Sequence, residues 1–169
     1  SNVVNTATFT GHYAVEGDAG YKSTCALAAN AVRTVWVDPS AGKDAAAGGE
    51  AAPLKTVSEA FRRLKASGEI ETIHLAEGTY SATSGESFPC ECDYGFNLRI
   101  VGAGKDATVF DGGGVTTANR FLRFGNCGGI ALSGIGFRNL KLATADQTLG
   151  KVQGGAVMFS ASADVTVTD

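Results

Sequence analysis

Hydrophobic and polar residues alternate in short segments along most of the chain, which is the pattern of β-strands with one buried face. In residues 6–15 the side chains of Ala7, Phe9, Tyr13 and Val15 share one face, and three threonines and a histidine occupy the other. Similar short apolar segments, each closed by a turn signal, predict further strands at 32–37, 70–76, 98–101, 108–110, 121–124, 130–137, 156–159 and 165–168.

One segment has helical spacing instead. Val57, Ala60, Phe61 and Leu64 fall on one face of a helix. Thr56 and Glu59 stand in the positions of a capping box, and Gly68 follows as a stop signal. The pattern predicts one short α-helix over residues 57–66.

Two segments of the chain repeat one another without a gap. When residues 121–134 are placed above 156–169, Phe124 aligns with Phe159, Ile130 with Val165, and Leu132 with Val167, an offset of 35 residues. A weaker repeat aligns the Ile73 and Leu75 pair with Leu98 and Ile100, 25 residues later. A constant strand pattern with a varying period indicates a solenoid whose corners accept insertions.

Stacked parallel strands explain this repeat better than an antiparallel β-sandwich does. A sandwich also uses short strands and glycine turns, but it has no reason to repeat a 14-residue pattern in register. We therefore expect an all-β parallel β-helix with one short N-terminal capping helix. Its domain should span residues 32–169, with coils over 70–169 and an open C-terminal end, preceded by an extension at 1–31.

Composition agrees with a fold of many sharp corners. The chain has 169 residues, of which 23 are glycine and 3 proline, and the glycines follow no three-residue period, which excludes collagen. The solenoid places most of the later glycines at corners: Gly102, Gly104, Gly112, Gly113, Gly114, Gly125, Gly128, Gly129, Gly134, Gly136, Gly154 and Gly155.

Four stretches between residues 34 and 114 resemble a known protein superfamily. The stretches T-V-W-V-D-P-S-A-G-K-D (34–44), A-A-P-L-K-T-V-S-E-A-F (51–61), I-H-L-A-E-G-T-Y (73–80) and L-R-I-V-G-A-G-K-D-A-T-V-F-D-G-G-G (98–114) resemble the N-terminal region of exported right-handed parallel β-helix proteins of the pectin-lyase-like superfamily. The later G-F-R-N-L (136–140) and G-G-A-V (154–157) are similar to repeats of polymorphic outer-membrane proteins. The resemblance implies a right-handed β-helix, an extracellular or cell-surface location, and a helix at 57–66 that covers the N-terminal end.

Charge and the length of the apolar runs argue against a nucleic-acid partner and against a membrane span. The formal net charge is −3 and the basic residues are scattered, so nothing resembles a stripe for binding phosphates, and we expect no nucleic-acid partner. No apolar run approaches the length of a membrane helix, so we expect no membrane span.

The four cysteines admit three interpretations. An even count in an exported protein favours two disulfides among Cys25, Cys90, Cys92 and Cys127, with the pairing open. A bridge between Cys90 and Cys92 would be strained. Buried free thiols and a metal site are the alternatives, although the C-x-C spacing differs from the C-x2-C of zinc sites.

Candidate chemistry is limited. Enzymes of the superfamily that this sequence resembles act on acidic polysaccharides, using carboxylates, Ca²⁺ and basic residues on their coils. Residues of the same types form a candidate glycan- or Ca²⁺-binding surface here: Asp106, Asp111, Arg99, Arg120 and Arg123. Both aspartates lie in glycine-rich turns, where such residues usually accept turn hydrogen bonds. His74 alternates with Ile73 and Leu75 and should point outward. We find no nucleophile–base pair, so we assign no catalytic residue and expect no cofactor, Ca²⁺ excepted.

The sequence therefore predicts an extracellular, non-enzymatic protein with a structural, adhesive or glycan-binding role. Its partners would be other copies joined end to end through strands containing Phe9, Tyr13, Val165 and Val167, a continuation of a longer chain, or a polysaccharide. The alternative is a fragment of a polysaccharide lyase or glycoside hydrolase that acts on acidic polysaccharide.

Overall fold

The computed structural model describes residues 6–10, 22–26, 34–67, 70–114, 116–117, 120–142 and 155–169. The chain divides into two compact units, residues 1–31 and 32–169. In the first unit, β1 (Thr6–Thr10) pairs antiparallel with β2 (Lys22–Ala26), and Phe9 lies opposite Ser23. The sequence predicted the first of these strands but not the second, and Tyr13 lies outside the described residues.

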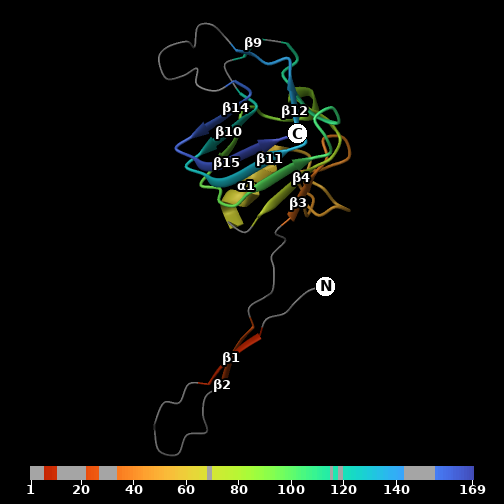
Figure 1. The fold of residues 1–169 in the computed structure, drawn as a ribbon. Coiled ribbons are helices and arrows are strands. Elements are labelled where there is room, and N and C mark those ends of the chain that lie inside the picture. Colours follow the sequence, from red (N-terminus) through yellow and green to blue (C-terminus); the bar gives the residue numbers. More distant parts are fainter. Residues whose placement is uncertain are drawn as a thin grey trace, which may run out of the picture. The chain divides into compact units, whose positions relative to one another are not determined.

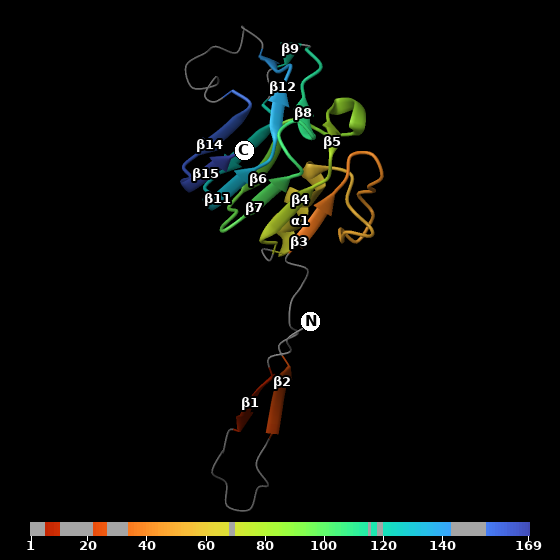
Figure 2. The same cartoon turned by 45° about the vertical axis from the view of Figure 1, so that its right-hand side comes forward.

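The second unit is built on a five-stranded parallel sheet. Its strands run in the order β15-β11-β7-β4-β3, and the arrows lie side by side in Figures 1 and 2. The strands are β3 (Thr34–Val37), β4 (Thr72–Leu75), β7 (Arg99–Gly102), β11 (Gly128–Ser133) and β15 (Ala163–Thr168).

Two smaller parallel sheets are joined to the large one in a fixed order. One contains β5 (Gly78–Tyr80), β8 (Thr108–Asp111) and β12 (Gly136–Arg138), and the other contains β6 (Cys90–Asp93), β10 (Leu122–Gly125) and β14 (Val157–Ser160). Two further short strands, β9 (Thr116–Thr117) and β13 (Lys141–Leu142), pair with each other in parallel. In the chain, β9 lies between β8 and β10, and β13 lies between β12 and β14. The chain visits the three main sheets in a constant order: first the five-stranded sheet, second the sheet of β5, and third the sheet of β6. We call one such passage a layer.

The 35-residue repeat is confirmed in the strand register. Phe124 pairs with Phe159, Ile130 with Val165, and Leu132 with Val167. The earlier 25-residue alignment is wrong, because Ile73 pairs with Ile100, 27 residues later. The predicted strand 130–137 is also two strands, β11 and β12, separated by Gly134 in the left-handed region.

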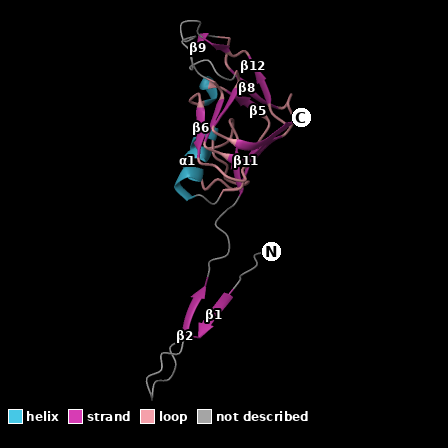
Figure 3. Ribbon diagram, turned by 60° about the vertical axis from the view of Figure 1, so that its left-hand side comes forward, coloured by secondary structure: helices cyan, strands magenta, loops and turns pink. Residues whose placement is uncertain are grey.

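The helix α1 (Val57–Ser67) follows the predicted span closely. Thr56 Oγ1 accepts the Glu59 N–H at 3.1 Å, which is half of the expected capping box. The Glu59 carboxylate does not complete the box, because it binds Arg62 and Arg63, and Asp44 accepts the Thr56 N–H instead. Val57, Ala60, Phe61 and Leu64 are buried, and α1 lies beside β6 (Figure 3).

Aromatic rings fill the space between the sheets. Tyr80, Phe110 and Phe137 come from successive strands of one sheet, with ring centroids 5.1 and 5.6 Å apart. Phe121 and Phe88 lie on this stack, and Phe61 of α1 meets Phe124 edge-on at 5.8 Å. The second unit is thus a mostly β fold of parallel sheets with one α-helix in its described part, and no described helix is long and apolar enough to cross a membrane.

One corner recurs in three layers with the same backbone. Tyr94, Asn126 and Ala161 follow β6, β10 and β14, and all three have left-handed backbones with φ of 62°, 52° and 49°. Three residues further on, Asn97, Gly129 and Asp164 are again left-handed. Asparagine and glycine tolerate this region, whereas a tyrosine rarely adopts it, so Tyr94 is unusual at its position.

Candidate functional site

Residues of several layers form a groove of about 660 Å³. We call it the hydroxyl groove, because four hydroxyl side chains line it beside apolar groups. Its lining comprises the hydroxyl residues Thr79, Ser81, Thr83 and Ser87, the apolar residues Ala82, Phe88, Phe121 and Leu140, the acids Glu86 and Asp111, and Gly112 and Gly113.

A short 3-10 helix fixes the hydroxyls on one side of the groove. This helix, η1 (Ala82–Ser84), is capped by Ser81, whose Oγ accepts the Ser84 N–H, while Ser84 Oγ accepts the Ser81 N–H. The hydroxyl oxygens of Ser81 and Thr83 are 2.8 Å apart. These bonds hold the hydroxyl groups in place before any ligand arrives, which lowers the entropic cost of binding.

Glu86 lies at the inner edge of the groove and holds the start of α1. Its carboxylate accepts the backbone N–H of Val57 and of Ser58, and it also contacts Ser58 Oγ at 3.2 Å and Cys90 Sγ at 3.3 Å. A carboxylate at a helix N-terminus is favoured by the unpaired N–H groups and the helix dipole. Burial nevertheless dominates and raises the pKa of Glu86 above its ordinary value.

The raised pKa of Glu86 predicts a pH dependence of stability. The folded chain holds this proton more tightly than the unfolded chain does, so the stabilisation is present below the ordinary pKa of 4.5 and is lost as pH rises through the folded pKa. Replacing Glu86 by Gln removes this titration. The amide also puts a donor where Ser58 N–H needs an acceptor, which costs about 1 kcal/mol.

We therefore expect Glu86→Gln to be less stable than the wild type at pH 4, and the gap to narrow as pH rises toward 7. Thermal unfolding of both proteins across this range measures the difference. Groups that titrate alike in both cancel, and the buried Cys90 and Tyr80 beside Glu86 have raised pKa values and stay neutral. A gap that widens with pH would contradict the prediction and show that the ionised carboxylate is the stabilising form.

Asp111 is the one residue of the predicted glycan or Ca²⁺ surface that lines the groove. Its carboxylate accepts N–H groups from Gly113 at 2.8 Å, Asn139 at 3.0 Å and Arg138 Nε at 2.8 Å, and these bonds lower its pKa. The expected turn hydrogen bond is thus confirmed. Because N–H donors already occupy both oxygens, the carboxylate does not fit the role of a Ca²⁺ ligand.

The other four residues of that predicted surface lie elsewhere. Asp106 is exposed in the turn before β8, and Arg99 is exposed on β7. Arg120 precedes β10 and is half-buried, and Arg123 binds Glu91 at 3.2 Å with Asp93 at 3.8 Å. None of these four residues lines the hydroxyl groove, and their joint role in binding a glycan or Ca²⁺ stays a prediction. Within the described ranges, no group of three or more His, Cys, Asp and Glu side chains could hold a metal.

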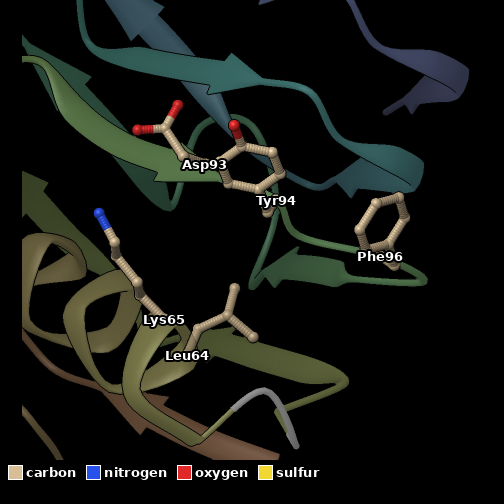
Figure 4. Close-up of a pocket in the computed structure, with 5 residues that line it drawn as sticks. All are labelled: Leu64, Lys65, Asp93, Tyr94 and Phe96. Carbon is tan, nitrogen blue, oxygen red and sulfur yellow. The ribbon is translucent and has the colours of Figure 1, made fainter.

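A second, smaller depression of about 240 Å³ lies where α1 meets the corner after β6. Figure 4 shows Leu64 and Lys65 on the helix side, and Asp93, Tyr94 and Phe96 on the corner side. The side chains of Tyr94 and Phe96 are 68% and 62% exposed, which is unusual for aromatic rings. Of these residues, the sequence pattern marked only Leu64, as part of the apolar face of the helix, and it predicted no site here.

The remaining predicted residues have varied surroundings. Cys90, Cys92 and Cys127 are buried free cysteines, while Cys25 is in β2 and its side chain is not described. His74 is half-buried and its ring stacks on Trp36 at 4.5 Å. Val165 and Val167 of β15 are 36% and 61% exposed, and Phe9 is in β1.

The comparison with known protein families identifies a match. The chain matches a family described as "Protein of unknown function (DUF1565)" over residues 40–151, which covers α1, the first two layers and most of the third. No curated protein matches the chain, and no solved structure does. Because the match spans well over half of the sequence, the chain belongs to the DUF1565 family.

Proposed function

We propose that the second unit is a right-handed parallel β-helix and acts outside the cell as a non-enzymatic structural or adhesive protein that binds a neutral polysaccharide in the hydroxyl groove. The recurring passage through three parallel sheets supports the helix, because stacking of equivalent strands produces this strand order. The extracellular location rests on the resemblance to exported proteins.

The lining of the groove carries the proposal. Sugars present both hydroxyl groups and apolar C–H faces, and the groove offers hydroxyls on Thr79, Ser81, Thr83 and Ser87 beside the ring of Phe88. Its volume of about 660 Å³ is in the usual range for small-ligand sites.

The charge of the groove favours a neutral sugar over an acidic one. No Lys or Arg is among the described residues that line it, whereas Glu86 and Asp111 are both acidic. A uronate carboxylate would therefore meet like charge without a cation to hold it. Both acids are also bound to N–H groups, of α1 for Glu86 and of Gly113, Arg138 and Asn139 for Asp111, so neither is free as a catalytic base.

Titration with oligosaccharides tests the proposal. We expect calorimetry to detect binding of at least one neutral hexasaccharide among cello-, xylo- and malto-oligosaccharides, and no binding of oligogalacturonate. Ala82→Arg places a long side chain in the groove at an exposed position and should weaken binding at least about tenfold. Ala45→Arg is the matched control, since Ala45 is exposed and lies outside the groove.

Three outcomes would count against the proposal. Binding that Ala82→Arg leaves intact would move the site elsewhere. Absence of binding to every neutral oligosaccharide would overturn the sugar assignment. Release of unsaturated products or new reducing ends from polygalacturonate, with or without Ca²⁺, would favour a lyase or hydrolase.

A further inference from the structure

Two buried thiols from successive layers face one another. Cys92 is in β6, and Cys127 follows β10, which pairs with β6 in parallel. Their sulfur atoms are 4.0 Å apart although the residues are 35 positions apart in the sequence. The side chains are 2% and 3% exposed, so the pair is enclosed by the fold.

Gly95 leaves room for the two sulfurs to meet. A Cβ atom on Gly95 would come within 2.8 Å of the Cys92 sulfur and 3.7 Å of the Cys127 sulfur. The backbone N–H of Gly95 donates to Cys127 Sγ at 3.3 Å. Any larger residue at position 95 would therefore push against the Cys92 sulfur, next to its contact with Cys127.

The groups around the Cys127 sulfur keep hydrogen-bond partners when a disulfide replaces the two thiols. Cys127 Sγ lies 3.3 Å from the carbonyl oxygen of Gly125 and 3.4 Å from that of Cys92. The Gly125 oxygen also accepts the Tyr94 N–H at 3.0 Å, so it keeps a donor when the thiol proton leaves. The Gly95 N–H can still donate to the sulfur of a disulfide.

Cys90 has different partners. It lies on the same face of β6, two residues before Cys92, and its sulfur is 3.3 Å from Glu86 Oε2 and 3.4 Å from Ser58 Oγ. These contacts direct it to the start of α1. The structure therefore separates one thiol that holds the helix from two that face each other.

We propose that Cys92 and Cys127 are joined by a disulfide when the chain folds in the presence of a low-molecular-weight disulfide such as oxidised glutathione. The thiolate of one cysteine attacks the glutathione disulfide and releases one glutathione thiolate. The second cysteine thiolate then attacks the resulting mixed disulfide and releases the other. Two protein thiols are oxidised, one glutathione disulfide is reduced to two thiols, and the two protons from the cysteines pass to the released thiolates or to water.

The disulfide between Cys92 and Cys127 should form during folding and not after it. The sulfurs must approach by about 2 Å to reach the S–S bond length of about 2.05 Å. In the folded chain, burial and the neighbouring Cys127 raise the pKa of the Cys92 thiol well above its ordinary value, so little thiolate is present. The partly folded chain exposes both thiols to the oxidant.

Peptide mapping of the wild-type chain tests the pairing directly. The unfolded protein is refolded with oxidised and reduced glutathione, its free thiols are alkylated, and it is digested with trypsin and an endoprotease that cleaves after glutamate. Cleavage after Glu91 separates Cys90 from Cys92. We expect the peptide of residues 92–99 to be linked to the peptide of residues 124–138, and reduction to release both.

The melting temperature provides a second test of the disulfide. The bridge closes a loop of about 35 residues, and the oxidised chain should melt about 5–10 °C above the reduced chain. Cys90→Ala is the matched control, because it should keep both the linked peptides and the increase in melting temperature. Cys127→Ala should lose both, and peptide mapping of the wild type needs no variant to fold.

The proposal fails if Cys92 or Cys127 is found linked to Cys90 or Cys25. It also fails if both remain alkylated as free thiols after oxidative refolding to a native circular dichroism spectrum. These results are independent of the sugar-binding test, since neither requires a ligand.

Discussion

Replacing Phe110 by Ala should destabilise the second unit by about 3–5 kcal/mol, which is a large share of the stability of an ordinary domain. Phe110 is fully buried and lies at the centre of the aromatic stack, with ring contacts to Tyr80, Phe137, Phe121 and Phe88. Truncation removes the ring and leaves a cavity that the rigid strands on either side cannot close. Thermal unfolding by circular dichroism should show the melting temperature falling by about 10 °C or more.

Phe96→Ala is the matched control for this result. Its ring is 62% exposed, so its removal should change stability by no more than about 0.5 kcal/mol. If Phe110→Ala and Phe96→Ala melt at the same temperature, the aromatic stack does not hold the layers together.

Gly102→Ala should destabilise the fold by about 3 kcal/mol through overpacking between layers. A Cβ at position 102 would run into the carbonyl oxygen of Gly134 in the next layer, and it would lie 3.0 Å from Thr108 Cβ. The obstacle is backbone, so it cannot move aside without breaking the parallel register of β7 and β11. Denaturant unfolding should show a lower midpoint at an unchanged slope.

Gly49→Ala provides the comparison. A Cβ there would meet nothing within 4 Å, and the substitution should be neutral or stabilise by about 0.5 kcal/mol. Equal stability of the two variants would mean that the layers do not approach as closely at Gly102 as the structure shows.

The pairing register of the strands was predictable where the amino-acid sequences of two successive layers resemble each other. Phe124, Ile130 and Leu132 have partners of the same character 35 residues later, because equivalent side chains stack in the core. The earlier alignment was wrong by two residues because a pattern of two apolar residues fits more than one offset. The pairing of Ile73 with Ile100 is decided by tertiary packing.

Two strands of the main sheets were not predicted from the sequence. β5 has only three residues, and β6, with the sequence C-E-C-D, has no aliphatic or aromatic residue to mark its buried face. The cysteines of β6 are its inward-facing apolar residues, and a C-x-C spacing indicates thiol chemistry more readily than it indicates a buried strand.

The candidate site was predictable only in part. The turn role of Asp111 followed from its place before three glycines, since aspartate accepts the N–H two residues on. The groove itself is assembled from four separate stretches of the chain, within 79–88 and 111–113 and at 121 and 140, and no local sequence pattern predicts such an assembly. A weaker signal was present in S-A-T-S at residues 81–84, where hydroxyl residues and a following glycine mark a capped turn. Tyr94 and Phe96, on either side of Gly95 in a polar stretch, were a similar signal for the smaller depression.

The fixed order of the sheets divides each layer into a constant part and a variable one. The connections from the second sheet to the third span residues 81–89, 112–121 and 139–156, and the last is by far the longest, yet the strands that they join keep their parallel pairing. Much of the hydroxyl groove is lined from these connections, including Ser81, Ala82, Thr83, Gly112 and Leu140. Connections of different length can therefore join the same strands while their parallel pairing stays the same. For protein engineering, these connections are therefore the natural place to insert additional residues.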